Sequence, residues 1–276
     1  MNKKILIILA LLTIFLAAGT VNAGFLDFLD NSKNTTTNDE KTLVVGFNSE
    51  FPPFAYLTDN KSYTGFDLEL AKEVCARNNW TFKAQPIINW DSKKVELDSG
   101  EIDCIWSEFT INGRENDYTW SNPYFNNTQK FVVKSDSNIS SISDLKGKTV
   151  EVLGESSGAE ALKNQNKTVG DTFGKIQEIK DYNTAFMDLE SGACDAILVD
   201  IGCANYELTE KFDRTHFKIV DEPLTHEQYG IGFKKGNTEL KNQVQKTLDD
   251  MYKDGTVDKI AQKYKDYGIP ENLIRP

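Results

Sequence analysis

The segment FTINGR, residues 109–114, carries the strongest candidate for binding a charged ligand. It ends in Arg114, and it follows an apolar stretch that reads as a buried strand. A guanidinium group pairs with a carboxylate through two parallel hydrogen bonds, and Thr110 adds a hydroxyl donor beside it. The alternative for Arg114 alone is a solvated surface position. The segment therefore predicts a carboxylate-binding loop.

A second candidate is the turn made by Ser156, Ser157 and Gly158, which follows another apolar stretch at residues 148–153. Small residues leave backbone amides accessible, and the N-terminus of a helix favours anions. The same residues could instead act only as a helix cap. Placed opposite Arg114, this turn would hold the other side of one carboxylate.

Asp200 stands at the end of the apolar run at residues 196–199, where a carboxylate can receive an ammonium group. Asp195, in front of that run, is predicted to be a structural turn or cap residue. An arginine, a turn of small residues and an aspartate together describe a receptor for a zwitterion. They predict a site for the head group of an α-amino acid, if the fold brings them together.

Two aromatic residues also follow predicted strands: Phe51 in SEFPPF and Trp90 in INWDS. Either could belong to the core, as most aromatic side chains do. At strand ends on two sides of a pocket they could instead enclose a flat, aliphatic or cationic side chain. Both are therefore candidates for the walls of a binding site.

Hydrophobic periodicity predicts the elements that must position these residues. Apolar residues at helical spacing follow Asp67, which is the predicted N-cap of a helix, and short apolar runs on either side predict strands. The first series has strands at 43–47, 81–84 and 102–106 and a second helix at 90–97. Its order is βαβαβ, which is typical of a parallel sheet with helices on its faces.

A similar series begins near Asp144, so the sequence predicts two similar lobes. Its strands are expected at 148–153, 176–179 and 196–199 and its helices at 158–163 and 183–190. Strands at 217–220 and 229–233 and amphipathic helices near 240–251 and 257–264 follow. If this tail returns to the first lobe, two strands cross between the lobes, and the lobes can close over a ligand.

The predicted fold class is therefore α/β, with two similar lobes that are each a mainly parallel sheet flanked by helices and joined by two hinge strands. The first lobe would comprise residues 42–127 and 227–276, and the second would comprise residues 128–226. In open sheets of this kind, ligands bind beyond the carboxyl ends of the strands. The candidate residues all stand at such positions.

The N-terminal residues predict export. Residues 1–23 combine Lys3 and Lys4, an apolar run shorter than the roughly 20 residues of a membrane span, and small residues at the expected cleavage point. They are predicted to be a secretory signal peptide, with an uncleaved membrane tether as the alternative. Residues 24–41, rich in Asn, Thr, Ser and Asp, are predicted to be a flexible linker. The expected location is the periplasm or the outer face of the cell membrane.

Composition narrows the possible partners. With 42 acidic and 31 basic side chains, the chain has a formal charge of −11, which disfavours binding to nucleic acid. Cys75, Cys104, Cys194 and Cys203 could form disulfides in a secreted protein, and we favour pairing the first two and the last two. Four buried free thiols are an equal alternative. The spacing of the cysteines and histidines indicates no metal site, and no cofactor is expected.

The chain also resembles a known family, the extracellular solute-binding proteins of polar amino-acid ABC importers (bacterial solute-binding protein family 3, with the type II periplasmic binding protein fold). The resemblance runs from about Leu43 to Tyr267. It rests on eight motifs in the order of the family: FPPF at 51–54, GFDLELA at 65–71, WDSKKVELDSGEIDC at 90–104, FTINGR at 109–114, YTWSNPY at 118–124, DLKGKTVEVL at 144–153, GACDAILVD at 192–200 and YGIGFKKGN at 229–237. It implies a protein that closes on one amino acid and passes it to a membrane permease with an ATPase.

By motif position, the resemblance implies that Arg114 binds the α-carboxylate with help from Thr110, Ser156 and Ser157. Asp200 would bind the α-ammonium group. Phe51 and Trp90 would be the aromatic walls. The protein would be a monomer without enzymatic activity.

Three departures from the family pattern concern the side-chain pocket and the arginine loop. Asn48 stands where many relatives have an acidic residue, and Glu108 stands where many have glycine. The loop is one residue shorter before Arg114, which leaves the roles of Asn112 and Gly113 open. We expect a polar or uncharged amino acid as ligand, with a basic one next because of Glu108.

Two other classes of function remain open from the sequence. The fold is also similar to that of periplasmic cyclohexadienyl and arogenate dehydratases, for which Glu108 would be the proton donor. A ligand-sensing subunit that signals to a separate membrane partner is the third possibility.

Overall fold

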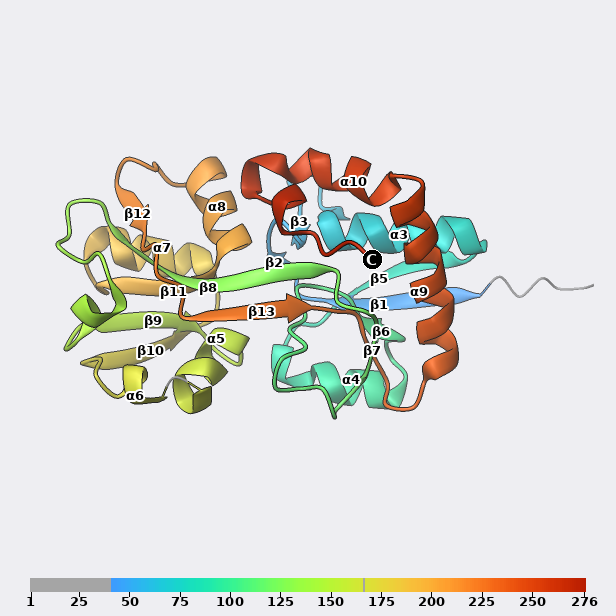
Figure 1. The fold of residues 1–276 in the computed structure, drawn as a ribbon, viewed down its shortest axis with the longest axis horizontal. Helices are drawn as coiled ribbons and strands as arrows, with labels where there is room; N and C mark the ends of the chain where they lie inside the picture. Colours follow the sequence, from blue (N-terminus) through green and yellow to red (C-terminus); the bar gives the residue numbers. More distant parts are fainter. Residues whose placement is uncertain (1–40, 166) are drawn as a thin grey trace, which may run out of the picture. The chain divides into compact units, whose positions relative to one another are not determined.

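The computed structural model describes residues 41–165 and 167–276 of the 276-residue chain. The predicted signal peptide, residues 1–23, and all of the predicted linker except Lys41 lie outside the described residues. In the described part, no helix combines the length and the apolar character that a bilayer span requires. Two lobes are built on two separate sheets (Figure 1).

The first lobe contains a five-stranded sheet with the order β5-β1-β6-β14-β7. Strand β1 pairs in parallel with β5 and β6, as the predicted βαβαβ unit requires, whereas β14 joins β6 and β7 antiparallel. A separate small sheet has the order β2-β3-β4. The strands are β1 (Thr42–Phe47), β2 (Glu50–Phe51), β3 (Ala55–Leu57), β4 (Tyr63–Thr64), β5 (Thr81–Pro86), β6 (Cys104–Ile105), β7 (Thr119–Trp120) and β14 (Gly232–Phe233).

Helices cover both faces of the first sheet. Helices α3 and α10 lie together on one side and α4 lies on the other (Figure 1). Strand β1 is buried because Leu43, Val45 and Phe47 are fully enclosed between these layers. The helical elements of this lobe are α3 (Phe66–Asn78), η1 (Trp90–Ser92), α4 (Lys93–Ser99), α9 (Thr238–Lys253), α10 (Thr256–Ala261), η4 (Gln262–Tyr267) and η5 (Pro270–Asn272).

The second lobe contains a six-stranded sheet with the order β10-β9-β11-β8-β12, and β13 pairs with β8. Strands β9, β10 and β11 are parallel, and β8 runs antiparallel to its neighbours. The strands are β8 (Phe125–Lys134), β9 (Thr149–Leu153), β10 (Lys175–Ile179), β11 (Ala196–Asp200), β12 (Phe217–Ile219) and β13 (Thr225–Tyr229). The helical elements are η2 (Ile142–Leu145), α5 (Ser157–Glu160), η3 (Ala161–Gln165), α6 (Lys167–Gly170), α7 (Tyr182–Ser191) and α8 (Ile201–Glu210).

Strands β8 and β13 are the two strands that run between the lobes (Figure 1). They pair antiparallel, with Phe125 opposite Tyr229 and Asn127 opposite Glu227. The rings of Phe125 and Tyr229 stack with centroids 5.5 Å apart, and the ring of Phe54 meets both edge to face. The predicted lobe boundaries fall at the paired Asn127 and Glu227; the division itself stays a prediction.

Several elements differ from the sequence prediction. The strand expected at 229–233 is two strands, because β13 ends at Tyr229 and β14 begins at Gly232. Strand β8 and helix α8 were not predicted. The polar start of β8, FNNTQ, resembles a turn in sequence, but Asn127 and Gln129 are buried because their amides bind carboxylates. Both sheets are therefore mixed. In each sheet the parallel strands belong to the predicted βαβαβ series, and a strand outside that series, β14 or β8, pairs antiparallel with one of them.

Asp67 is not the N-cap of α3, as the sequence suggested. Gly65 occupies that position, with φ of 129°. A side chain at Gly65 would collide with the backbone of Phe54, since an added Cβ would lie 2.2 Å from its carbonyl oxygen. Asp67 lies instead in the first turn of α3, fully buried, where its carboxylate accepts hydrogen bonds from the amide of Glu108 and the hydroxyl of Tyr124. It therefore supports the cleft rather than the helix end.

The favoured disulfides are not formed. Cys75, Cys104, Cys194 and Cys203 are all free and buried. Burial raises the pKa of the Cys75 thiol to about 11 and keeps it protonated. The alternative of four buried free thiols is what the structure contains.

Candidate functional site

An inner cavity lies where strand ends of the two lobes meet, and all nine predicted site residues line it. These are Asn48, Phe51, Trp90, Glu108, Thr110, Arg114, Ser156, Ser157 and Asp200, and Phe109 and Leu153 complete the lining. The cavity measures about 30 Å³. That is room for about two water molecules, so a larger ligand requires the walls to move apart.

The loop that carries Arg114 is fixed to a strand that runs between the lobes. Asn112 accepts a hydrogen bond from the amide of Gln228 in β13 through its Oδ1, at 2.8 Å. Gly113 adopts φ of 82°, a left-handed conformation that suits glycine. The indole of Trp120 donates to the carbonyl of Arg114 at 3.1 Å. The shorter loop thus has a definite geometry, in which Asn112 anchors it and Gly113 turns it.

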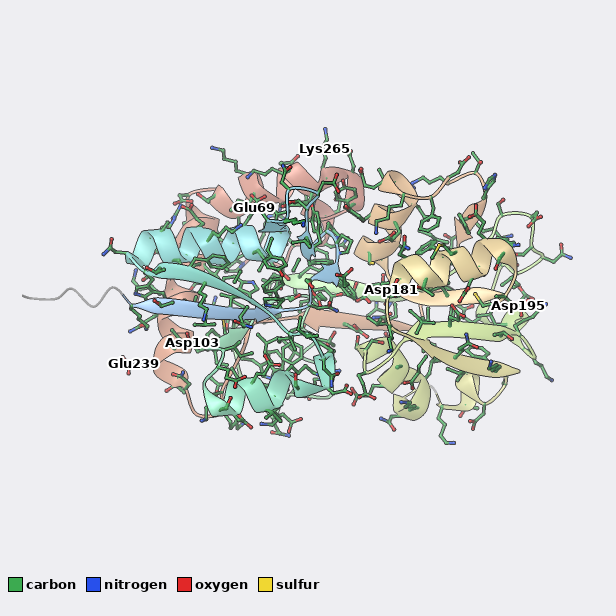
Figure 2. All side chains as sticks on the ribbon, turned by 180° about the vertical axis from the view of Figure 1, so that it is seen from behind. Glu69, Asp103, Asp181, Asp195, Glu239 and Lys265 are labelled. Carbon is green, nitrogen blue, oxygen red and sulfur yellow. The ribbon has the colours of Figure 1, made fainter. Side chains whose placement is uncertain are left out.

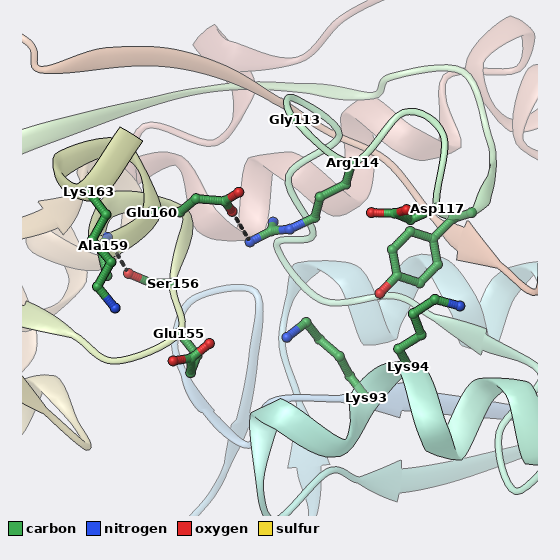
Figure 3. Close-up of a pocket in the computed structure, with 11 residues that line it drawn as sticks. Lys93, Lys94, Gly113, Arg114, Asp117, Glu155, Ser156, Ala159, Glu160 and Lys163 are labelled. Carbon is green, nitrogen blue, oxygen red and sulfur yellow. Dashed lines mark hydrogen bonds and ion pairs between the residues drawn. The ribbon is translucent and has the colours of Figure 1, made fainter. Parts of the chain in front are cut away.

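The guanidinium of Arg114 reaches across the mouth of the cleft. Its Nη2 lies 3.2 Å from Oε2 of Glu160, on helix α5 of the other lobe (Figure 3). Its Nη1 donates a hydrogen bond to the carbonyl of Thr110. The side chain of Arg114 is 14% exposed, and that of Glu160 is 42% exposed. The sequence does not single out Glu160, because an exposed acidic residue in a helix has no distinctive pattern.

The serine turn has two different roles. Ser156 is the N-cap of α5, and its hydroxyl accepts a hydrogen bond from the amide of Ala159 at 3.1 Å. Ser157 donates its hydroxyl to Oε2 of Glu227 at 2.9 Å. The expected helix opening is confirmed, but the Ser156 hydroxyl is engaged in capping.

Glu227 is the buried residue at which both lobes meet. Its Oε2 accepts hydrogen bonds from Thr110 of the first lobe at 3.0 Å and Ser157 of the second at 2.9 Å. The amides of Asn127 and Gln129 in β8 donate to the same oxygen at 3.3 and 3.5 Å. The sequence leaves open whether Glu227 affects ligand selectivity, and alternation along β13 is the signal that places it on the same face as Tyr229.

Asp200 ends β11, as predicted, and is 3% exposed. Its Oδ1 accepts hydrogen bonds from the amide of Asn127 and the hydroxyl of Tyr229. Burial, together with the charge of Glu227, raises the pKa of Asp200 to about 7. Asp195, at the other end of the strand, accepts the amide of Thr149 at 2.8 Å and lies at the outer end of the lobe (Figure 2). Its predicted structural role is confirmed.

Glu108 faces the inner cavity from the first lobe with 8% of its surface exposed. Its carboxyl accepts a hydrogen bond from the hydroxyl of Ser107. Burial raises the pKa of Glu108 well above its usual range, and the charges of Asp67 and Asp200 add to the effect. Its φ of 39° is left-handed, which costs a residue other than glycine about 1 kcal/mol or more.

The aromatic candidates and Asn48 complete the inner cavity. Phe51 packs edge to face on Tyr182 of the second lobe, with centroids 5.6 Å apart. Trp90 meets Phe109 edge to face at 6.0 Å. Asn48 is bound to its surroundings through the amide of Glu50 and the hydroxyl of Ser107. Phe51 and Trp90 thus give the inner cavity apolar walls, and Asn48 adds a polar side chain to its lining.

An outer pocket of about 390 Å³ opens in front of Arg114 (Figure 3). Lys93 and Lys94 line it from the first lobe, and Glu155, Glu160 and Lys163 line it from the second. Lys93 donates a hydrogen bond to the carbonyl of Trp90 at 3.0 Å. Burial lowers the pKa of Lys93, and the nearby charge of Arg114 lowers it further. The outer pocket is thus lined by charges of both signs.

Comparisons with known proteins agree with the α/β fold of the chain. Residues 43–267 match the family described as bacterial extracellular solute-binding proteins, family 3. The chain is 30% identical to the L-cystine-binding protein TcyJ of Escherichia coli strain K12, over 92% of this chain and 94% of that protein. Its fold is similar to that of an ABC uptake transporter substrate-binding protein from Streptococcus pneumoniae with bound histidine, with a TM-score of 0.76 and 30% identity over 81% of this chain and 92% of that one. An ancestral arginine-binding protein bound to arginine gives a TM-score of 0.74 and 35% identity over 82% and 98% of the two chains.

Proposed function

The chain belongs to family 3 of the bacterial extracellular solute-binding proteins, and we propose that it captures a free amino acid between its lobes and delivers it to an ABC importer. The observation that carries this proposal is that Arg114 of one lobe and Asp200 of the other line the same cavity. A cation and an anion on opposite walls match the carboxylate and the ammonium of one zwitterion.

In this proposal Arg114 binds the α-carboxylate and Asp200 binds the α-ammonium group. Thr110 and Ser157 supply hydroxyl donors from the two lobes, and Phe51 and Trp90 enclose the side chain. Because Asp200 and Arg114 belong to different lobes, a ligand that binds both stabilises the closed arrangement. Affinity then depends on closure as well as on the individual contacts.

Two protein carboxylates already occupy the donors that a ligand would use. Glu160 binds Arg114, and Glu227 binds the hydroxyls of Thr110 and Ser157. A guanidinium has five N–H donors, so a ligand can share Arg114 or displace Glu160. We propose that the ligand's carboxylate replaces Glu160 when the lobes close on it.

Membership of an extracellular family supports a proposal for export and partners. We propose that residues 1–23 direct the chain out of the cytoplasm and that residues 24–41 connect it to its place of action. The partners would be a membrane permease and its ATPase, and the protein would bind without catalysing a reaction. The proposed function requires neither nucleic acid nor a second copy of the chain.

Thermal unfolding tests the proposed function. The protein would be unfolded in denaturant to remove bound ligand, refolded, and heated with each of the twenty amino acids. A ligand at about 100 times its Kd stabilises the folded state by about 2.7 kcal/mol, which raises the Tm by several degrees. Cooperative melting with no shift from any amino acid would contradict the proposal.

A dehydratase on this fold is the alternative that Glu108 favours, because its raised pKa leaves it able to donate a proton. Loss of prephenate or arogenate absorbance on mixing with the protein would support that alternative. Unchanged absorbance together with a thermal shift from an amino acid would exclude it in favour of binding.

A further inference from the structure

The charges around the inner cavity do not balance for an amino acid with a neutral side chain. Among the described residues that line it, Arg114 is the one cation, and Glu108 and Asp200 are acids. Asp67 and Glu227 add two more buried carboxyl groups directly behind the lining. A neutral zwitterion would supply a carboxylate for Arg114 and an ammonium for Asp200, and it would leave Glu108 without a cationic partner.

The hydrogen bonds directly behind the cavity lining show the same imbalance. The amide nitrogen of Asn127 is spent on Asp200 and Glu227, and that of Gln129 on Ser157 and Glu227. The carbonyl oxygens of both side chains are buried without a hydrogen-bond partner. A buried acceptor without a donor is costly, so the layer behind the lining lacks N–H donors rather than acceptors.

Cationic side chains bring donors and positive charge to a cavity that is lined and backed by carboxyl groups. An ammonium group carries three donors and a guanidinium carries five, and neither carries an acceptor. Phe51 and Trp90 line the same cavity and offer apolar walls for the methylene groups that lead to such a cation. The geometry, the charge and the hydrogen bonds all favour the same class of ligand.

We propose that the ligand is an amino acid with a cationic side chain, such as arginine, lysine or ornithine, and that Glu108 neutralises its second positive charge. This inference rests on the proposed function. It reverses the order expected from the sequence, in which Asn48 favoured an uncharged ligand. Glu108 takes over the acidic role at the side-chain pocket that Asn48 does not provide.

The protonation of Glu108 distinguishes the two kinds of ligand. Burial and the neighbouring charges of Asp67 and Asp200 favour its neutral form without ligand. A cationic side chain beside it stabilises the carboxylate, so binding releases a proton to the solvent. A neutral ligand of the same shape leaves the proton in place.

Titration calorimetry with matched ligands tests the proposal. Arginine would be compared with citrulline, which has nearly the same shape without the charge, and lysine with norleucine. We expect one cationic ligand to bind at least roughly 100-fold more tightly than its neutral partner, because only the cationic side chain gains a charged partner in Glu108. The Glu108→Gln variant should reduce this ratio to less than roughly tenfold by weakening the cationic ligand.

Glu207→Gln is the matched control, because Glu207 is another buried glutamate that does not line the cavity. It should leave the ratio unchanged. Wild-type protein should also release more protons than Glu108→Gln on binding the same cation, measured in two buffers with different ionisation enthalpies. If Glu108→Gln fails to fold, the wild type is measured with arginine and with citrulline, and equal proton release on binding the two ligands would overturn the role of Glu108.

The outcomes separate the inference from the proposed function. If citrulline, norleucine, glutamine or cystine binds as tightly as the cationic amino acids, the protein is an amino-acid receptor and the cationic ligand class is wrong. If Glu108→Gln keeps the full preference for the cation, Glu108 is not its partner. If no amino acid binds at all, the proposed function itself fails.

Discussion

The guanidinium of Arg114 and the carboxylate of Glu160 meet across the mouth of the cleft, with Nη2 of one 3.2 Å from Oε2 of the other. One residue belongs to the loop after β6 and the other to helix α5, so this ion pair joins the two lobes. It holds the group that a ligand's carboxylate would bind. Glu160 is therefore a competitor for the ligand within the protein itself.

The Glu160→Gln variant should bind its amino acid more tightly. Removing the charge frees Arg114, and a half-exposed ion pair is worth up to about 1 kcal/mol, so affinity should rise about two- to fivefold. Titration calorimetry would measure the change. The control is Glu155→Gln, which makes the same change of charge in the outer pocket. Glu155 forms no ion pair among the described residues, so this variant should change the affinity less. Weaker binding by Glu160→Gln would mean that Glu160 supports the liganded state.

Arg114→Ala should abolish most of the binding. Without the guanidinium, the ligand's carboxylate would be buried with no cationic partner, at a cost on the order of 3 kcal/mol or roughly 100-fold in affinity. Calorimetry on the folded variant would measure this loss, with Arg214→Ala, which changes an arginine outside the cavity, as the control. Unchanged affinity would remove Arg114 from the site.

The sequence predicts the lining of the inner cavity well because those residues stand at the ends of strands. Arg114, Asp200 and the serine turn each follow an apolar stretch, and the carboxyl ends of parallel strands meet at one edge of a sheet. Local patterns are therefore enough to place them together. The same logic places Asp195 away from the cleft, at the other end of β11.

The residues that the sequence does not predict act through contacts between distant segments. Glu160 matters only because α5 of one lobe faces a loop of the other, and Asp67 because α3 presents it to the amide of Glu108. Strand β8 begins with polar residues whose burial depends on the carboxylates of Asp200 and Glu227. No local periodicity carries such information, since the partner lies about 40 to 100 residues away.

Glu227→Gln should favour an open arrangement of the lobes. The Oε2 atom of Glu227 accepts hydrogen bonds from Thr110 of one lobe and Ser157 of the other, and from two amides of β8. Glutamine keeps one acceptor oxygen but carries no charge, so the hydrogen bonds that join the lobes at this atom lose the strengthening that an ionised acceptor gives. Small-angle scattering without ligand should show a larger radius of gyration than for wild type. Glu239→Gln, on the exposed surface of α9, should match wild type (Figure 2).

The four cysteines should all be free in protein prepared without reductant. Each is buried, and burial raises the pKa of Cys75 to about 11 and that of Cys194 to about 12. Because the thiolate is the reactive form, a thiol reagent should react slowly with the folded protein. After unfolding, the same reagent should react with all four cysteines. Two reactive thiols or none in the unfolded protein would indicate disulfides instead.

Asp67 should make stability fall as the pH rises. Burial raises the pKa of Asp67 from 3.8 to about 7 in the folded protein. Between these two pH values the folded state holds a proton that the unfolded state has released. Raising the pH through this window therefore lowers the free energy of unfolding, by up to about 4 kcal/mol at 1.36 kcal/mol per pH unit. Above pH 7 this contribution stops changing. Asp67→Asn has no titrating group at this position, so its Tm should fall less than the Tm of wild type between pH 5 and 8. The control is Asp59→Asn, on the exposed surface, whose Tm should follow that of wild type. Parallel curves for wild type and Asp67→Asn would show that Asp67 is ionised in the folded protein throughout this range.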